Sequence, residues 1–235
     1  PKVDPTGGVD VAAKNLVAYL SLDSKDKCSS ASNVTLAEVI GQGDFTAEGA
    51  RGGCYVNKSN SHETQAGLRF NVPANFLKNM TSFTFSAWMN APTQRGAIVS
   101  FDGGTDANWG ELDLFLDGGN ADGTVLKGYF FNSTSEWGGF FPNYKGLEVA
   151  QNKWVYVTLT YDETTSEDAL WVNGVKVFSS TCYAGPKPAE GEQALLGAFH
   201  STDVTSLYVG AFASRETGKS SEAWLSYFGG KIDEI

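Results

Sequence analysis

The sequence predicts an all-β fold of two antiparallel sheets packed face to face, and three features lead to that prediction. Short runs of alternating apolar and polar residues, the pattern of half-buried strands, recur along the 235 residues. The loops between these runs are rich in Gly, Asp, Asn and Ser, and the 27 glycines favour tight turns. No helical pattern longer than two turns separates the strands. We therefore expect one β-sandwich domain over residues 1–235.

The alternating runs give the predicted strands in chain order. They are Asn15–Ser21, Leu68–Val72, Ser82–Asn90, Gly96–Phe101, Glu111–Leu116, Lys127–Asn132, Trp154–Tyr161, Ala169–Val172, Val175–Ser179, Ser206–Phe212 and Trp224–Ile232.

Local signals refine this pattern at three places. Asn173-Gly174 separates two of the runs, and this dipeptide supplies the positive φ angles of a two-residue hairpin turn. Residues 75–78 and 192–196 are at most short helical turns. The segment Ser24–Gly43 has no clear period, so we expect a long surface excursion there.

Composition restricts the partners. Seventeen basic and 27 acidic residues give a net charge of −10, and no Lys/Arg cluster is present, which disfavours nucleic acid and anionic membranes. Neutral glycans or metal ions are more compatible with this charge. No apolar run is long enough for a transmembrane helix, and the chain opens on Pro1 without a signal sequence, which is compatible with a leader removed earlier.

The three cysteines, Cys28, Cys54 and Cys182, are widely spaced, which disfavours a zinc or redox motif. One disulfide with a buried thiol and three reduced core cysteines both stay open. His62 and His200 are too few for a three-histidine zinc site.

Several stretches together resemble the laminin G-like domains of the concanavalin A-like lectin and glucanase superfamily, in the same order along the chain. They are Leu16–Asp23, SFTFSAWM at Ser82–Met89, WVYVTLTYD at Trp154–Asp162, LWVNGV at Leu170–Val175, LYVG at Leu207–Gly210 and GKIDE at Gly230–Glu234. The resemblance implies a jelly-roll sandwich. It also implies a bacterial protein, exported to the periplasm, the cell surface or the exterior (a lipoprotein among the options), that handles glycans.

One motif tests the catalytic alternative. In the β-glucanases of the superfamily that this chain resembles, three carboxylates lie on one strand. Glu111 and Asp113 match the first two of these positions. Positions 115 and 116 are Phe and Leu, and Asp117 lies one residue too far, so the acid/base is missing. We assign no catalytic residue and expect Glu111 and Asp113 to accept hydrogen bonds from sugar hydroxyls.

Aromatic residues carry the binding prediction, because sugar rings present apolar C–H faces to flat side chains. Trp88, Trp154 and Trp171 lie within strand patterns and are expected to pack in the core. Other aromatics lie in or beside polar loops and are candidates for glycan contact: Trp109, Trp137, Phe140, Phe141 and Tyr144. We expect Trp109 and Trp137 to flank one groove, with Tyr144 nearby.

Calcium is the candidate ion, since acidic Gly-rich loops supply oxygen ligands. The resemblance implies a structural calcium between the exit of the first strand and the last strand, at Asp23 and Asp233. The oxygen-rich loops Asp102–Asn108 and Asp117–Asp122 lack the spacing of a complete calcium loop.

The sequence thus favours an exported carbohydrate-binding, lectin-like module that recognises glycans at the cell surface. A glucanase-type glycoside hydrolase with an incomplete carboxylate motif and a protein–protein adhesion domain are the alternatives.

Overall fold

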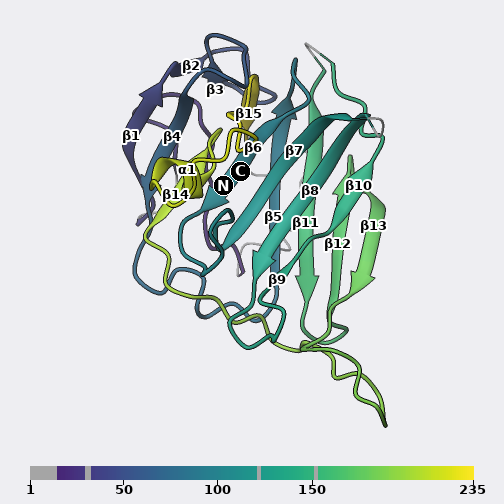
Figure 1. Cartoon of the computed structure of the whole chain (residues 1–235). Coiled ribbons are helices and arrows are strands. Elements are labelled where there is room, and N and C mark those ends of the chain that lie inside the picture. The colour runs from purple at the N-terminus through teal and green to yellow at the C-terminus, as the bar shows by residue number, and fades with distance from the viewer. Residues whose placement is uncertain (1–14, 30–32, 121–122, 151–152) are drawn as a thin grey trace, which may run out of the picture.

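A computed structural model describes residues 15–29, 33–120, 123–150 and 153–235. The chain forms two antiparallel sheets packed face to face, as the sequence predicts (Figure 1). One short helix, α1 (Ala213–Glu216), accompanies them in the described part of the chain. Within the same residues no helix is long and apolar enough to cross a membrane.

The first sheet has eight strands in the order β1-β4-β14-β6-β7-β8-β10, and β9 pairs with β8. Its strands are β1 (Thr35–Gly41), β4 (Ala66–Asn71), β6 (Gly96–Phe101), β7 (Leu112–Asn120), β8 (Gly123–Phe131), β9 (Gly139–Phe140), β10 (Asn143–Lys145) and β14 (Ser206–Val209). The second sheet has seven strands in the order β13-β12-β11-β5-β15-β3-β2. They are β2 (Gly43–Thr46), β3 (Cys54–Asn57), β5 (Phe83–Asn90), β11 (Val155–Asp162), β12 (Glu167–Val172), β13 (Val175–Thr181) and β15 (Lys231–Asp233).

The core lies between the two sheets and follows from the period of two in the strands. In β11, Val157 and Leu159 are fully buried while Thr158 between them is only half-buried. Aromatic rings join the layers at the centre. The ring of Phe130 on β8 lies 5.5 Å from that of Phe83 on β5 and 5.3 Å from that of Tyr161 on β11. Such edge-to-face and tilted contacts add to the area that these large side chains bury.

The predicted hairpin is confirmed. Strands β11 and β12 pair with Val157 opposite Val172, and β12 then pairs with β13 with Val172 opposite Val175. The turn residues Asn173 and Gly174 have φ angles of 50° and 80°. Positive φ at both central residues is the type I′ geometry whose twist matches that of the strands.

Three sequence predictions about elements are wrong. The Ser24–Gly43 segment contains the edge strand β1, and its alternation is weak because most of its residues face solvent. Residues 15–21 form no strand; Leu20 only exchanges two backbone hydrogen bonds with Ile235. The run 224–232 is irregular apart from the start of β15. Strands β2, β3, β9 and β10 were not predicted.

Two further expectations concern single side chains. All three cysteines are buried free thiols, which resolves the alternatives that the sequence left open in favour of reduced residues. Trp88, Trp154 and Trp171 are half-buried and do not belong to the main core, contrary to expectation. Trp88 contacts Tyr156 across the sheet, with 5.2 Å between ring centroids, and Lys176 lies over the ring of Trp171.

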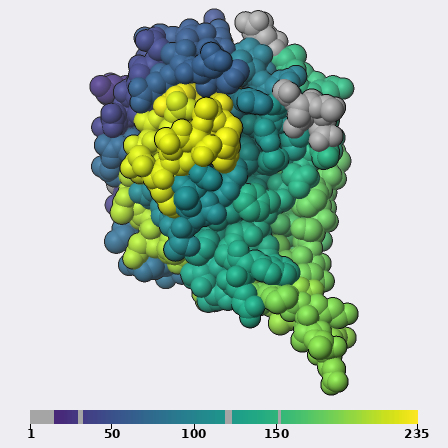
Figure 2. Space-filling view, in the orientation of Figure 1, coloured from purple at the N-terminus to yellow at the C-terminus, as the bar shows by residue number. Residues whose placement is uncertain are grey.

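Another segment of the chain covers part of the outer face of the eight-stranded sheet. The segment after β14, including α1, folds back over it and is tied to β6 by hydrogen bonds from Ala213 N to Ser100 Oγ and from Ala97 N to Ser226 O. Figure 2 shows this C-terminal segment, in yellow, over one side of the face, with the teal surface of β7 and β8 beside it. The outward-facing residues of β7 and β8 therefore lie at the border between this segment and the open surface.

Candidate functional site

Six aromatic rings gather on the outer face of β7 and β8, and we call them the outer aromatic cluster. Its members are Trp109, Phe115, Tyr129, Phe141, Phe212 and Trp224. Along β7 the even-numbered leucines enter the core, so Phe115 projects outward. Tyr129 does the same from β8, where Asp113 and Tyr129 are paired across the strands.

Trp109 is the centre of the cluster. Its ring centroid lies 5.0 Å from those of Phe115 and Trp224, 5.4 Å from that of Phe141, 5.6 Å from that of Tyr129 and 6.1 Å from that of Phe212. These separations and the mixture of stacked and edge contacts are those of interacting aromatic pairs. The indole is thereby fixed in place before any ligand arrives.

Exposure rises from the base of the cluster to its rim. Phe115, Tyr129 and Phe212 are buried and Trp109 is half-buried, whereas Trp224 and Phe141 are 41% and 48% exposed. Large exposed aromatics on a preformed apolar base are typical of a surface that another molecule covers.

A cavity of about 190 Å³ opens beside the cluster. Its lining is Arg95, Trp109, Phe115, Leu116, Asp117, Lys127, Phe212 and Trp224. The charged members lie at its polar side, where Lys127 Nζ is 2.6 Å from Asp117 Oδ2 and Arg95 Nε donates to the carbonyl of Gly118 at 2.6 Å. An apolar wall with a few fixed polar groups is the usual composition of a ligand site.

A second cavity of about 300 Å³ lies on the other side of Trp109, between its loop and α1. Lys219 closes its edge by donating to the carbonyls of Gly103, Gly104 and Trp109 at 3.1, 3.2 and 3.2 Å. This ammonium group joins the Trp109 loop to the C-terminal segment, so the two walls of the cluster are connected through it.

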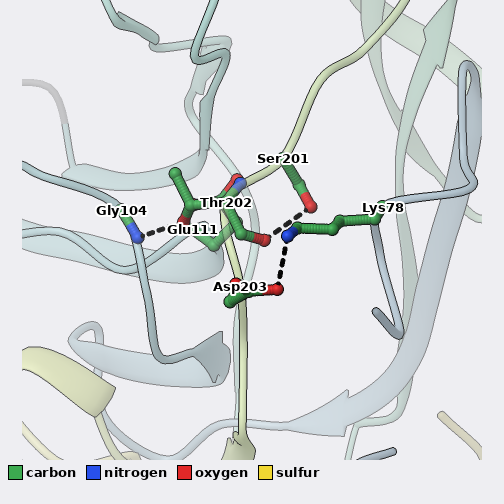
Figure 3. Close-up of polar contacts among 6 residues, drawn as sticks. All are labelled: Lys78, Gly104, Glu111, Ser201, Thr202 and Asp203. Atoms are coloured by element: carbon green, nitrogen blue, oxygen red, sulfur yellow. Dashed lines mark hydrogen bonds and ion pairs between the residues drawn. The ribbon is translucent and has the colours of Figure 1, made fainter. Parts of the chain in front are cut away.

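Glu111 does not reach the surface, which corrects its predicted role toward sugar hydroxyls. Its carboxylate is fully buried and accepts hydrogen bonds from Thr202 N at 2.6 Å and Thr202 Oγ1 at 2.5 Å. Thr202 Oγ1 in turn accepts from Gly104 N at 2.9 Å, as Figure 3 shows. Burial raises the pKa of Glu111, and the Thr202 donors oppose that rise. The residue joins the start of β7 to the 201–203 segment.

Asp113 is also buried, so its predicted role is corrected in the same way. It accepts hydrogen bonds from Ser100 Oγ and, at 2.9 Å, from Gly110 N. Burial raises the pKa of Asp113 to about 7. Because Gly110 follows Trp109 directly, this carboxyl group fixes the loop that carries the central indole.

Trp137 is not a member of the outer aromatic cluster. Trp137 is 50% exposed, but its ring is not among the five that contact Trp109 in the described structure. Phe141, four residues later and also a sequence candidate, contacts Trp109 instead. Tyr144 packs against the main core between the sheets, so it faces away from the cluster. Phe140 is likewise a core residue.

The structure brings Asp23 and Asp233 to the same loop. Asp23 Oδ1 accepts from Gly53 N, and Asp233 Oδ2 accepts from Arg51 N, each at 2.9 Å. Burial raises the pKa of Asp233 to about 6. Within the described ranges no group of three or more His, Cys, Asp or Glu side chains is arranged to hold a metal. Two carboxylates that already accept amide hydrogen bonds fall short of the six to eight oxygens that calcium takes.

Sequence reasoning missed Arg95, Lys127 and Trp224 as members of the site. One signal was available for Lys127, since it alternates along β8 with core residues and shares an outward face with Tyr129. Trp224 was assigned to a strand, and only the fold of the C-terminal segment places it beside Trp109.

Solved structures of similar fold were found. The globular domain of T. cruzi calreticulin aligns with a TM-score of 0.51 and 9% identity, over 92% of this chain and 84% of that chain. The carbohydrate recognition domain of Emp47p aligns with a TM-score of 0.46 and 14% identity, over 93% and 94%. Domains LG4-5 of mouse laminin alpha1 align with a TM-score of 0.47 and 12% identity, over 75% of this chain and 40% of that chain.

At these identities the likeness concerns the fold alone, and this chain spans less than half the length of the laminin chain. No curated protein matches the sequence. Residues 62–235, most of the chain, match the family described as the Concanavalin A-like lectin/glucanases superfamily, and the protein therefore belongs to that laminin G-like family.

Proposed function

We propose that the chain is a carbohydrate-binding, lectin-like module of an exported protein, that it recognises glycans at a cell surface, and that the glycan lies on the outer aromatic cluster. The rim of that cluster carries the proposal. Trp224 and Phe141 are exposed beside the half-buried Trp109, next to a cavity with charged groups at its polar side.

The chemistry of a sugar ring fits this arrangement. Its C–H face is apolar and stacks on a flat aromatic ring, while its hydroxyls need hydrogen-bond partners at the edge of that ring. Trp109 and Trp224 offer the flat surface, and Asp117, Lys127 and Arg95 offer polar groups along one side. The cavity of about 190 Å³ is smaller than the roughly 300–1,000 Å³ of pockets for drug-sized ligands. That size suits one sugar unit of a longer chain lying across the open surface.

Alanine variants of the rim test the proposal. A glycan array should first identify a ligand, whose affinity for Trp224→Ala and Phe141→Ala is then measured by isothermal titration calorimetry. We expect each variant to weaken binding by about 2 kcal/mol, the loss typical of an aromatic hot spot. Melting temperatures should fall only modestly, because both side chains lie at the rim and are 41% and 48% exposed.

Trp137→Ala is the matched control, since Trp137 is an equally exposed tryptophan outside the cluster. We expect it to leave affinity unchanged. A loss of binding confined to Trp137→Ala would contradict the proposal and favour the site that the sequence predicted. Binding to a polypeptide that free sugars do not inhibit would favour an adhesion domain. Hydrolysis of a glucan that Glu111→Gln abolishes would favour a glycoside hydrolase.

Calcium stays a separate proposal, supported by the hydrogen bonds that hold Asp23 and Asp233 against the same loop at residues 51–53. Backbone carbonyls and water would have to complete the coordination. If calcium binds there, it stabilises the folded state according to its concentration relative to its dissociation constant. Chelation should then lower the melting temperature of the native protein but not that of Asp233→Ala. Equal melting temperatures with and without chelator would contradict the proposal.

A further inference from the structure

We propose that the glycan bound on the outer aromatic cluster carries an oxyanion on its sugar, a carboxylate or a sulfate, and that Arg95 binds this group. The inference rests on the proposed function of the same surface and adds the chemical class of the ligand. Arg95 lines the cavity and, in the part of the chain that the structure describes, has no acidic partner.

Arg95 is held in position but keeps most of its donors. Its Nε donates to the carbonyl of Gly118 at 2.6 Å. A Cβ at Gly118 would lie 2.4 Å from the carbonyl oxygen of Gln94, so β7 and the turn that carries Arg95 approach closely there. Within the described residues no carboxylate forms an ion pair with Arg95. The two Nη groups of the guanidinium therefore remain for a ligand.

The other charges of the cavity do not satisfy Arg95. Asp117 lies within 2.6 Å of Lys127 Nζ, and this pair is mutually neutralising. Two cations and one anion leave the cavity with one net positive charge, although the protein as a whole carries −10. A local positive site on an acidic protein favours a ligand that brings one negative charge to that position.

The surroundings of Arg95 strengthen the preference for an oxyanion. Trp109, Phe115, Phe212 and Trp224 form the apolar walls of the same cavity. Apolar walls lower the local dielectric constant, which increases the attraction between unlike charges. The planar guanidinium also matches the two oxygens of a carboxylate or sulfate through parallel N–H···O hydrogen bonds, a geometry that lysine lacks. A sugar ring stacked on Trp224 can thus direct its charged substituent at Arg95.

Matched oligosaccharides test the inference. Affinities are measured by calorimetry at about 0.1 M salt, where the Debye length is about 10 Å. The probes are a neutral glucan, a glucuronate-containing oligosaccharide of equal length and a sulfated one. We expect the native protein to bind one of the charged ligands at least tenfold more tightly than the neutral one. The charged ligand that is preferred identifies the oxyanion.

Four variants assign the effect to Arg95. Arg95→Gln should reduce affinity for the charged ligand to the level of the neutral one, and Arg95→Lys should restore only part of it. Asp117→Asn should strengthen binding of the charged ligand, because it removes a nearby negative charge and releases Lys127. Lys153→Gln is the control, since Lys153 is an exposed cation paired with Glu148 outside the cavity.

The outcomes separate the inference from the proposed function. Equal affinity for neutral and charged glycans, with binding still lost in Trp224→Ala, would overturn the inference and leave the proposed function intact. Retention of the charge preference in a folded Arg95→Gln protein would also overturn the inference. Failure of all glycans to bind would overturn both.

Discussion

Trp109 occupies its place because buried polar groups fix the loop around it. Asp113 accepts a hydrogen bond from Gly110 N, and Lys219 binds the carbonyl of Trp109 itself. A pre-positioned indole loses little conformational freedom on binding, and such preorganisation increases affinity. The two carboxylates that the sequence singled out are therefore buried, and Asp113 fixes the backbone that carries the outer aromatic cluster's central indole.

The burial of Asp113 depends on a distant segment of the chain, so the sequence alone did not predict it. Alternation along β7 places Asp113 on the outer face of the sheet, where a strand pattern alone implies exposure. The segment after β14 covers that face, and Ser100, which receives the hydrogen bond from Ala213 N, donates to Asp113. Contact with a segment about a hundred residues away leaves no local signal.

The first prediction concerns the pH dependence of stability. Unfolded aspartate has a pKa of about 3.9, and burial raises the folded pKa of Asp113 to about 7. The folded protein therefore holds this proton more tightly. The resulting stabilisation is complete below about pH 3.9 and is lost as the pH rises through about 7. Between pH 5 and pH 8, the free energy of unfolding of the native protein should therefore fall by roughly 2–3 kcal/mol more than that of Asp113→Asn.

Urea denaturation at several pH values across that interval measures this difference. Asp162→Asn is the control, because hydrogen bonds from Thr164 lower the pKa of exposed Asp162, and its contribution changes only in more acidic solution. Parallel profiles for the native protein and Asp113→Asn would contradict the raised pKa of Asp113.

The strands differ in how far the sequence determines them. Strand β11 alternates cleanly between buried and half-buried residues because one face meets the core, and the sequence located β5, β11 and β12 well. Edge strands such as β1, and short ones such as β2 and β9, carry little alternation and were missed. The hairpin at Asn173-Gly174 was identified because its turn depends on two residues alone.

The second prediction concerns the contact between β9 and β8. A Cβ at Gly139 would lie 2.3 Å from Cε2 and 2.7 Å from Oη of Tyr129, and the buried Tyr129 ring supports Trp109. Gly139→Ala should therefore displace Tyr129, destabilise the protein by roughly 1–3 kcal/mol and weaken glycan binding. A double-mutant cycle with Tyr129→Leu should give a coupling energy above about 0.5 kcal/mol. Additive losses would show that the two positions do not interact.

For the whole molecule, resemblance and pattern predicted the sandwich and its family, whereas the outer aromatic cluster could be identified only in the assembled fold. Trp109, Phe141 and Trp224 lie far apart in the sequence. Phe141 reaches Trp109 from the chain between β9 and β10, which both pair with β8, and Trp224 reaches it because the C-terminal segment folds back over β6. The opposite sheet also presents aromatics on its outer face, including Trp88 and Trp171. Tryptophans thus lie on three separate surfaces of the sandwich: the outer aromatic cluster, the outer face of the opposite sheet and the loop that carries Trp137.

The indole N–H signals of the six tryptophans distinguish these surfaces in one titration, because each gives a separate peak in a ¹⁵N-resolved NMR spectrum. Each peak is assigned by replacing one tryptophan with phenylalanine. On addition of the glycan identified by the array, the signals of Trp224 and Trp109 should shift with ligand concentration. Those of Trp88, Trp154, Trp171 and Trp137 should stay in place. Shifts of Trp88 and Trp171, or of Trp137, without shifts of Trp224 and Trp109 would contradict binding on the outer aromatic cluster.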